Sequence, residues 1–305
     1  MRNRQTKFGL GIAIATLCLG VGVAAFERQY FRPNRSFDPI IYKSRDGLCS
    51  VQPSGDVSAY CPGIFFEHPA ISPDGNLIAA VERISSQGGP AANTRLVVAD
   101  RRGVVVQSIA SSDGFIRPVW APDGQYLYAI NYELRGAIGR WAWPSNKRIA
   151  IPIRDLDRGC NSIQGISFSA SGHRAALLCD FRRIYIAATG SIDIQIQRLL
   201  SLSFTNVGFA SWLSDDQLMT VARMEKGRAA KLWRIDVNTA ATHAIDTPEL
   251  SFRDYVSVSP DKKSAVATAR QLESNEWSLW RIDFDRLRTT RLTHGSEDVS
   301  PTWAH

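Results

Sequence analysis

Apolar runs of strand length alternate with short polar turns along most of the chain. In one recurring pattern, an apolar residue ends a run and a tight turn built mostly from Ser, Pro, Asp and Gly follows. The five complete copies are Ile71–Gly75, Trp120–Gly124, Phe168–Gly172, Trp212–Asp216 and Val258–Lys262, and a sixth begins at Trp303. The copies start 49, 48, 44, 46 and 45 residues apart. Proline presets φ, aspartate bonds to the downstream backbone and glycine accepts a positive φ, so each copy predicts a turn between two strands.

The run after each turn, and a second series of runs further along, repeat with the same period. The runs that follow the turns are Leu77–Val81, Tyr126–Ile130, Ala175–Cys179, Leu218–Ala222 and Ala265–Ala269. The second series is Leu48–Val51, Leu96–Ala99, Arg140–Trp143, Ile184–Ala187, Leu232–Ile235 and Leu279–Ile282. Each member of the second series precedes another polar turn and one more strand. The unit is therefore four strands, named a to d in chain order, in about 46 residues, which is the length of a propeller blade.

The two ends of the repeat complete each other. On the N-terminal side, Pro39–Tyr42, Leu48–Val51 and Val57–Tyr60 supply strands b, c and d with no a strand before them. On the C-terminal side, Pro301–Trp303 supplies an a strand with nothing after it. Pairing these segments makes a sixth blade and closes a ring, which removes the exposed edges of an open array. The sequence thus predicts an all-β, six-bladed β-propeller of four-stranded blades.

The segment ahead of the repeats has a different character. Residues 8–26 carry no charge, follow Arg2, Arg4 and Lys7, and predict an apolar helix. Two interpretations stay open: a signal peptide cleaved before Phe26, or an anchor kept in the inner membrane. Both place the rest of the chain outside the cytoplasm, in the periplasm or another extracytoplasmic compartment. The expected organisation is residues 1–26 as signal or anchor, 27–38 as linker and 39–305 as propeller.

Cysteine usage agrees with export. Apart from Cys18, the chain has Cys49, Cys61, Cys160 and Cys179, which allow three disulfide connectivities. The repeat frame favours Cys49–Cys61, across a c–d hairpin, and Cys160–Cys179, between a segment that precedes an a strand and the b strand beside it. The alternative is four buried free thiols.

Composition and charge narrow the function classes. Hydrophobic residues make up 44% and charged residues 21% of the chain, which excludes a mainly disordered or coiled-coil protein. The formal net charge of +7 falls to +4 without Arg2, Arg4 and Lys7, too little to indicate nucleic-acid binding. The five histidines lack metal-ligand spacing, and no Gly-x-Ser-x-Gly motif occurs. We therefore expect no catalytic residue, cofactor or metal.

The repeat carries a family resemblance. Turns such as Ser72-Pro73-Asp74-Gly75, and Thr293-His294 ahead of Ser300-Pro301-Thr302-Trp303, resemble the TolB-type propeller repeat over residues 39–305. TolB itself has an α/β domain before its propeller, for which this chain leaves no room, so the chain looks like a stand-alone TolB-like propeller. The resemblance implies an extracytoplasmic role in protein interaction.

Polar residues gather in the predicted d–a connections, which meet the b–c connections on one face of a propeller. The candidate binding residues are Glu67, His68, Asp113, Arg117, Asn206, Arg253, Asp254, Glu297 and Asp298. Acids, bases and a histidine near a central channel could bind a polar ligand. Alternatively, these side chains only cap strand ends and pair with neighbouring loops.

The prediction for function is a non-enzymatic binding module that docks a protein of the cell envelope through this face. The alternative is a glycan-active enzyme or sugar-binding sensor that uses the channel mouth. In that case Glu67, His68, Arg253 and Asp254 should be intolerant of substitution.

Overall fold

A computed structural model describes most of the chain after residue 37. The described residues are 38–55, 59–83, 94–111, 114–131, 137–149, 151–156, 159–190, 193–225, 228–295 and 297–303. The chain divides into two compact units, Met1–Phe31 and Arg32–His305, and every described residue belongs to the second. The helix expected over residues 8–26 lies outside the described residues. Within them, no helix has the length and apolar character needed to cross a membrane.

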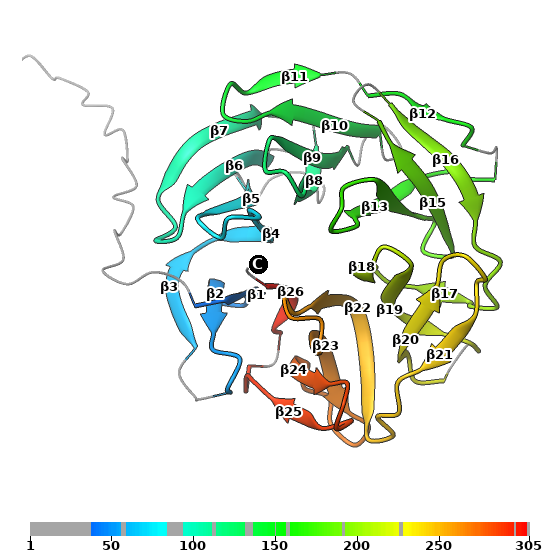
Figure 1. Ribbon diagram of the computed structural model, residues 1–305. Coiled ribbons are helices and arrows are strands. Elements are labelled where there is room, and N and C mark those ends of the chain that lie inside the picture. Colours follow the sequence, from blue (N-terminus) through cyan, green and yellow to red (C-terminus); the bar gives the residue numbers. More distant parts are fainter. Residues whose placement is uncertain are drawn as a thin grey trace, which may run out of the picture. The chain divides into compact units, whose positions relative to one another are not determined.

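Six sheets, antiparallel apart from one short added strand, are arranged around one axis (Figure 1). In each sheet the a strand of the repeat lies nearest the centre. Blade 1 consists of β26 (Val299–Trp303), β1 (Ile40–Ser44), β2 (Gly47–Val51) and β3 (Tyr60–Ile64). Blade 2 consists of β4 (Phe66–Ile71), β5 (Leu77–Arg83), β6 (Thr94–Asp100) and β7 (Val105–Ser111). Blade 3 consists of β8 (Phe115–Trp120), β9 (Tyr126–Asn131), β10 (Ala137–Ala142) and β11 (Lys147–Ile149).

The remaining three blades follow the same order, with small additions in two of them. Blade 4 consists of β13 (Ile163–Phe168), β14 (Arg174–Cys179), β15 (Arg183–Thr189) and β16 (Ile194–Leu199), with β12 (Ile153–Arg154) parallel to β16. Blade 5 consists of β17 (Asn206–Val207), β18 (Ser211–Ser214), β19 (Gln217–Arg223), β20 (Lys231–Asp236) and β21 (Thr242–Ala244). Its inner strand is split into β17 and β18, which both pair with β19. Blade 6 consists of β22 (Leu250–Val258), β23 (Ser264–Gln271), β24 (Ser278–Asp283) and β25 (Thr289–Arg291).

The ring closes as the sequence predicts. β26 pairs antiparallel with β1, so that Trp303 lies opposite Ile40, and the last strand of the chain becomes the inner strand of blade 1. Ile40 and Trp303 are both buried, in a cluster that also holds Leu279 of blade 6. The prediction of an all-β, six-bladed propeller with four-stranded blades is therefore confirmed.

One strand lies elsewhere than predicted. The fourth strand of blade 1 is Tyr60–Ile64, whereas the sequence pattern indicates residues 57–60. Pro62 and Gly63 disfavour a strand locally. The pairing of Ser50 with Tyr60 and of Leu48 with Ile64, across a bulge in the register, outweighs that local preference.

The recurring turn owes its shape to a serine and an aspartate two residues apart. In blade 2 the Ser72 hydroxyl donates to Asp74 Oδ1 at 2.5 Å, and Ser72 Oγ accepts the backbone N–H of Leu77 at 2.9 Å. In blade 6 the Ser259 hydroxyl donates to Asp261 Oδ1 at 2.6 Å. These hydroxyl bonds hold the pKa of both aspartates below the usual value. The turn is thus fixed by its own side chains.

Neighbouring blades are joined near their axis by repeated hydrogen bonds. The Trp120 Nε1–H donates to the Ala70 carbonyl at 3.2 Å, and the Trp212 Nε1–H donates to the Ser167 carbonyl at 3.1 Å. Each tryptophan is buried and crosses from its own inner strand to that of the preceding blade. The recurring tryptophans therefore fix the angle between blades as well as fill space.

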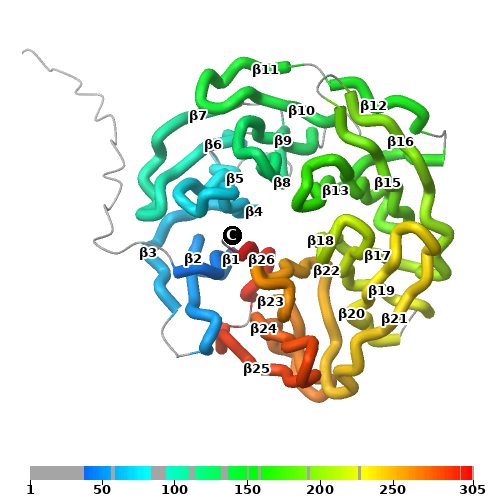
Figure 2. Tube along the Cα trace, viewed as in Figure 1, coloured from blue at the N-terminus to red at the C-terminus, as the bar shows by residue number. Residues whose placement is uncertain are grey.

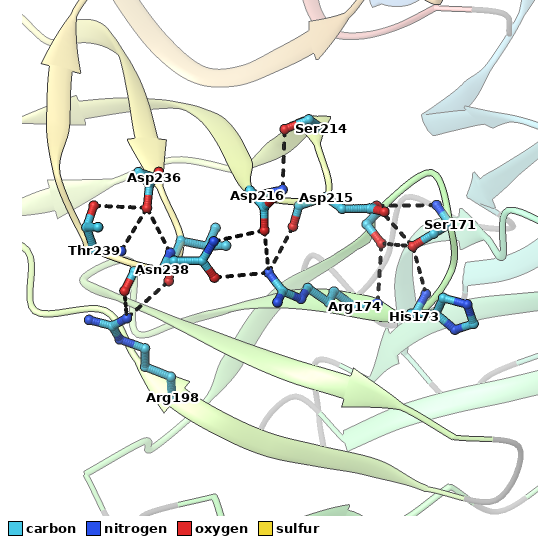
Figure 3. Close-up of polar contacts among 12 residues, drawn as sticks. Ser171, His173, Arg174, Arg198, Ser214, Asp215, Asp216, Asp236, Asn238 and Thr239 are labelled. Atoms are coloured by element: carbon cyan, nitrogen blue, oxygen red, sulfur yellow. Dashed lines mark hydrogen bonds and ion pairs between the residues drawn. The ribbon is translucent and has the colours of Figure 1, made fainter.

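A polar network joins blades 4 and 5 at their turns (Figure 3). Arg174 donates to Asp216 Oδ1 at 3.0 Å and to the Asp215 carbonyl at 3.1 Å, while Ser171 Oγ donates to Asp215 Oδ1 at 3.0 Å. Arg198 donates to the carbonyl of Asn238. These groups are mostly exposed, so the network orients the two blades more than it stabilises them.

Both predicted disulfides are present. Cys49 is bonded to Cys61 across β2 and β3, and Cys160 is bonded to Cys179 at the end of β14. The alternative of four free thiols is therefore wrong. Disulfides of this kind are typical of proteins that fold in an oxidising compartment.

Candidate functional site: the central channel

One residue from each blade occupies the same position beside the propeller axis. The position is three residues before the end of the apolar run that leads into the recurring turn. The six residues, called here the channel ring, are His68, Arg117, Gly165, Phe209, Tyr255 and Ser300. All six line one cavity, and Figure 2 shows the inner strands that carry them grouped around the axis.

The backbone is irregular at this position. The ladder between inner strand and second strand shifts register at Glu67/Ala70 in blade 2 and at Ile116/Val119 in blade 3. His68, Arg117 and Ser300 have φ values of 50°, 52° and 55°, in the left-handed region. A bulged residue leaves the ladder and its side chain is re-aimed. The bulges therefore release these residues from the ladder beside the channel.

Four members of the channel ring contact one another. The Arg117 guanidinium lies over the Phe209 ring, 4.4 Å from its centroid, and donates to the Gln164 carbonyl at 2.9 Å. Phe209 stacks on Tyr255 with centroids 4.7 Å apart. The Tyr255 hydroxyl is 3.5 Å from Arg117 Nε and 3.4 Å from His68 Nδ1. Side chains of blades 2, 3, 5 and 6 thus meet across the axis.

Gly165 makes room for this cluster. A Cβ atom at residue 165 would lie 2.6 Å from Cδ1 of Phe209, closer than real Cβ contacts. Glycine here lets the Cδ1–Cε1 edge of the Phe209 ring approach the inner strand of blade 4, while Arg117 lies over the ring. Gly165 is therefore required for the packing of Phe209 in this cluster.

His68 is held neutral. Burial, and then the positive charges of Arg117, Lys43 and Arg83, lower the pKa of His68 from 6.5 to about 3. At neutral pH the imidazole therefore adds no charge to the channel and can accept a hydrogen bond from the Tyr255 hydroxyl.

The cavity has a volume of about 480 Å³ and runs from the channel ring to the a–b turns, where Pro73, Pro122 and Pro260 line it. Between the two ends lies a second ring of smaller side chains, one residue before the end of each run. This second ring is Ala70, Val119, Ser167, Ser211, Ser257 and Thr302. The large side chains of the channel ring thus lie at the end near the d–a and b–c connections.

Most of the residues chosen from sequence lie around this cavity rather than in it. His68 and Arg117 line it, and Tyr255 connects them. Glu67 pairs with Arg83 at 3.2 Å, and Arg253 lies 3.8 Å from Asp254 and over the Trp277 ring.

Of the other sequence candidates, Asn206, Glu297 and Asp298 do not line the cavity. Asn206 is exposed on β17, where it pairs with Arg223 of β19. Glu297 is exposed and forms a parallel bridge with Trp277, and Asp298 is buried. Asp113 lies outside the described residues. In the part of the chain that the structure describes, no cluster of His, Cys, Asp and Glu could hold a metal ion.

Sequence reasoning missed Phe209, Tyr255 and Gly165. Each stands at the same distance before its turn as His68 and Arg117, so the repeat frame contained the signal. This signal is hard to recognise because an aromatic residue or a glycine in an apolar strand is usually a residue of the hydrophobic core.

The ring of six sheets and the axial cavity define the class, a six-bladed β-propeller with a cavity along its axis. The chain belongs to the family described as Lipoprotein LpqB beta-propeller domain, whose model matches residues 53–288. The family match and the six blades confirm the TolB-like propeller that the repeat indicates.

Solved structures with similar folds are distant in sequence. Hydrazine synthase of Kuenenia stuttgartiensis is 20% identical with a TM-score of 0.51, over 73% of this chain and 64% of that one. A protein assigned as TolB in Agrobacterium tumefaciens is 17% identical with a TM-score of 0.47, over 62% and 65%. This chain therefore spans just under two thirds of the length of either. A chain of a nidogen–laminin complex is 11% identical with a TM-score of 0.62, over 87% and 98%. No curated protein sequence matches.

Replacing His68 by Gln is expected to flatten the acid dependence of stability. The pKa of His68 is 6.5 in the unfolded chain and about 3 in the folded protein. Between pH 6.5 and pH 3 the unfolded state therefore binds more protons than the folded state. Stability then falls as pH drops from 6.5 toward 3, by about 2 kcal/mol at pH 5, and His68→Gln removes that loss. Urea unfolding between pH 7 and pH 4.5 measures it. The exposed His243→Gln is the control, and equal slopes for wild type and His68→Gln would contradict the prediction.

Proposed function

We propose that this chain is an exported, non-enzymatic binding module that docks a protein of the cell envelope. The docking surface is the face formed by the d–a and b–c connections, named here the loop face. Export is supported by the two disulfides, which form and persist outside the cytoplasm, and by membership of a family described as a lipoprotein propeller. Residues 8–26 would supply the signal or the anchor.

The observation that carries docking is a set of large apolar side chains exposed on the loop face. Phe65, in the connection from β3 to β4, is 67% exposed. Met224 and Leu272, in the b–c connections of blades 5 and 6, are 44% and 52% exposed. Contiguous apolar surface rimmed by polar residues marks an interaction site, and the proposal is that these three side chains contribute to such a surface.

Charged and aromatic groups occur in the same d–a and b–c connections or at the strand ends beside them. Arg253 and Arg270 both lie over the Trp277 ring, at 5.6 and 5.3 Å from its centroid. Tryptophan and arginine are the side chains that contribute most to binding at protein interfaces, while exposed ion pairs such as Glu67–Arg83 define a polar rim.

The test is a gentle-detergent pull-down of the full-length protein from its native envelope, with mass spectrometry. The triple variant Phe65→Ser, Met224→Ser and Leu272→Ser is expected to lose a stoichiometric partner that the wild type retains. A matched control carries Val106→Ser, Leu199→Ser and Leu287→Ser, which remove exposed apolar side chains on the outer strands and a c–d turn. Loss of the partner by both variants, or by neither, would overturn docking at the loop face.

A further inference from the structure

The side chains that line the cavity along the axis include two cationic groups and no carboxylate. Among its lining residues the ionisable side chains are His68, Arg117, Tyr255 and Lys262, and His68 is neutral. In the described parts of the chain, no carboxylate lies within ion-pair distance of Arg117 or Lys262. Among the described residues, no carboxylate therefore neutralises the two positive charges that line the cavity.

Lys262 stands where other blades have glycine. The fourth residue after the apolar run end is Gly75, Gly124 and Gly172 in blades 2, 3 and 4, each with a positive φ. Lys262 adopts the same left-handed backbone, with a φ of 61°, which a residue with a Cβ disfavours. It is half-buried, and burial lowers its pKa. The sequence thus places a cation beside the channel at the expense of local backbone strain.

The wall between the two cations presents hydrogen-bond donors. Ser211 Oγ accepts the backbone N–H of Val258, and Ser257 Oγ accepts that of Trp303, both at 3.1 Å. A serine hydroxyl that accepts still has its own hydrogen to donate. Ser167, at the equivalent position in blade 4, has a buried hydroxyl with no hydrogen-bond partner. The hydroxyls of Ser211 and Ser257 suit a ligand that is rich in acceptors, whereas the buried Ser167 hydroxyl would have to rotate to reach such a ligand.

The geometry points to a small organic dianion as the ligand of this channel, with one acid group against Arg117 and the other against Lys262. The run from the channel ring to the end of the inner strand is three residues, or about 10 Å. Side chains such as Val119, Ile166 and Val256 line the same cavity, so a short methylene chain fits between the acid groups. This site does not rest on the docking proposed for the loop face.

The test uses α,ω-dicarboxylates as probes of the full-length protein, by isothermal titration calorimetry and thermal shift. Suberate is expected to bind, while the neutral 1,8-octanediol does not, and binding is expected to weaken with added salt. Failure of adipate, suberate and sebacate to bind, or equal binding of suberate and the diol, would overturn the proposal.

Variants at the two cations complete the experiment. Arg117→Gln is expected to weaken suberate binding about tenfold. Lys262→Gly is expected to weaken it similarly while leaving the melting temperature unchanged or raised, because glycine restores the turn of the other blades. The matched control is Lys263→Ala, the exposed neighbour, which should bind as the wild type does. Unchanged affinity in a folded Lys262→Gly protein would also overturn the proposal. Loss of the envelope partner in the loop-face variant has no bearing on either result.

Discussion

A chain that ends after Asp298, and so lacks β26, is expected to lose most of its folding stability. Trp303 is 7% exposed and packs in one cluster with Ile40, Tyr42 and Leu279. Removing a buried tryptophan alone costs about 3–5 kcal/mol, against a typical total stability of about 5–15 kcal/mol. The truncation also leaves the inner edge of β1 unpaired. We therefore expect a chain that aggregates or unfolds without a cooperative transition.

Urea unfolding followed by circular dichroism measures this effect. The control removes only residues 304 and 305, which follow β26. Trp303→Ala, which keeps the backbone pairing, should be intermediate, with a loss of about 3–5 kcal/mol. A truncated chain with the unfolding midpoint of the wild type would show that ring closure contributes little.

Removing the two disulfides is expected to produce the second large loss. The bond Cys49–Cys61 closes a sequence separation of 12 residues, and Cys160–Cys179 closes one of 19. By chain entropy each is worth about 3 kcal/mol, slightly more for the longer loop. We expect Cys49→Ala with Cys61→Ala, and Cys160→Ala with Cys179→Ala, each to lower stability by that amount.

Chemical denaturation with and without dithiothreitol checks this prediction. The reduced wild type should have the same stability as the variant in which the four disulfide-bonded cysteines are replaced by alanine. Dithiothreitol should not lower the stability of that variant further. If the reduced wild type keeps its full stability, the disulfides do not constrain the unfolded state as proposed.

The fold was predictable from sequence because its signals are local. A turn such as Ser72–Gly75 is fixed by hydrogen bonds between residues two to five positions apart, and it returns in nearly every blade. The disulfide pairs followed from the same frame, since hairpin partners are set by distance from a turn. The fourth strand of blade 1 was misplaced because long-range pairing with β2 overrides the local effect of Pro62 and Gly63.

The candidate site was only partly predictable, because its geometry depends on departures from regular structure. Charged residues in predicted connections were natural candidates, and His68 and Arg117 do line the channel. Phe209 and Tyr255 resemble core residues in sequence. A register shift in β22 places Tyr255 beside the axis, and Phe209 lies in the break between β17 and β18. Arg253 and Glu67, two residues and one residue before that position in their blades, lie outside the cavity.

The channel ring also bears on how such a protein can evolve. Each of its six members comes from a different blade, and four of them contact one another across the axis, whereas the hydrogen bonds of Trp120 and Trp212 join neighbouring blades independently of the ring. A substitution of Arg117, Phe209 or Tyr255 therefore alters the channel lining together with the contacts of its neighbours in the ring, while it leaves the recurring turns and the tryptophan hydrogen bonds in place. A change of ligand preference is therefore expected to need coupled substitutions in several blades, while the turns outside the ring keep the folds of such descendants superimposable.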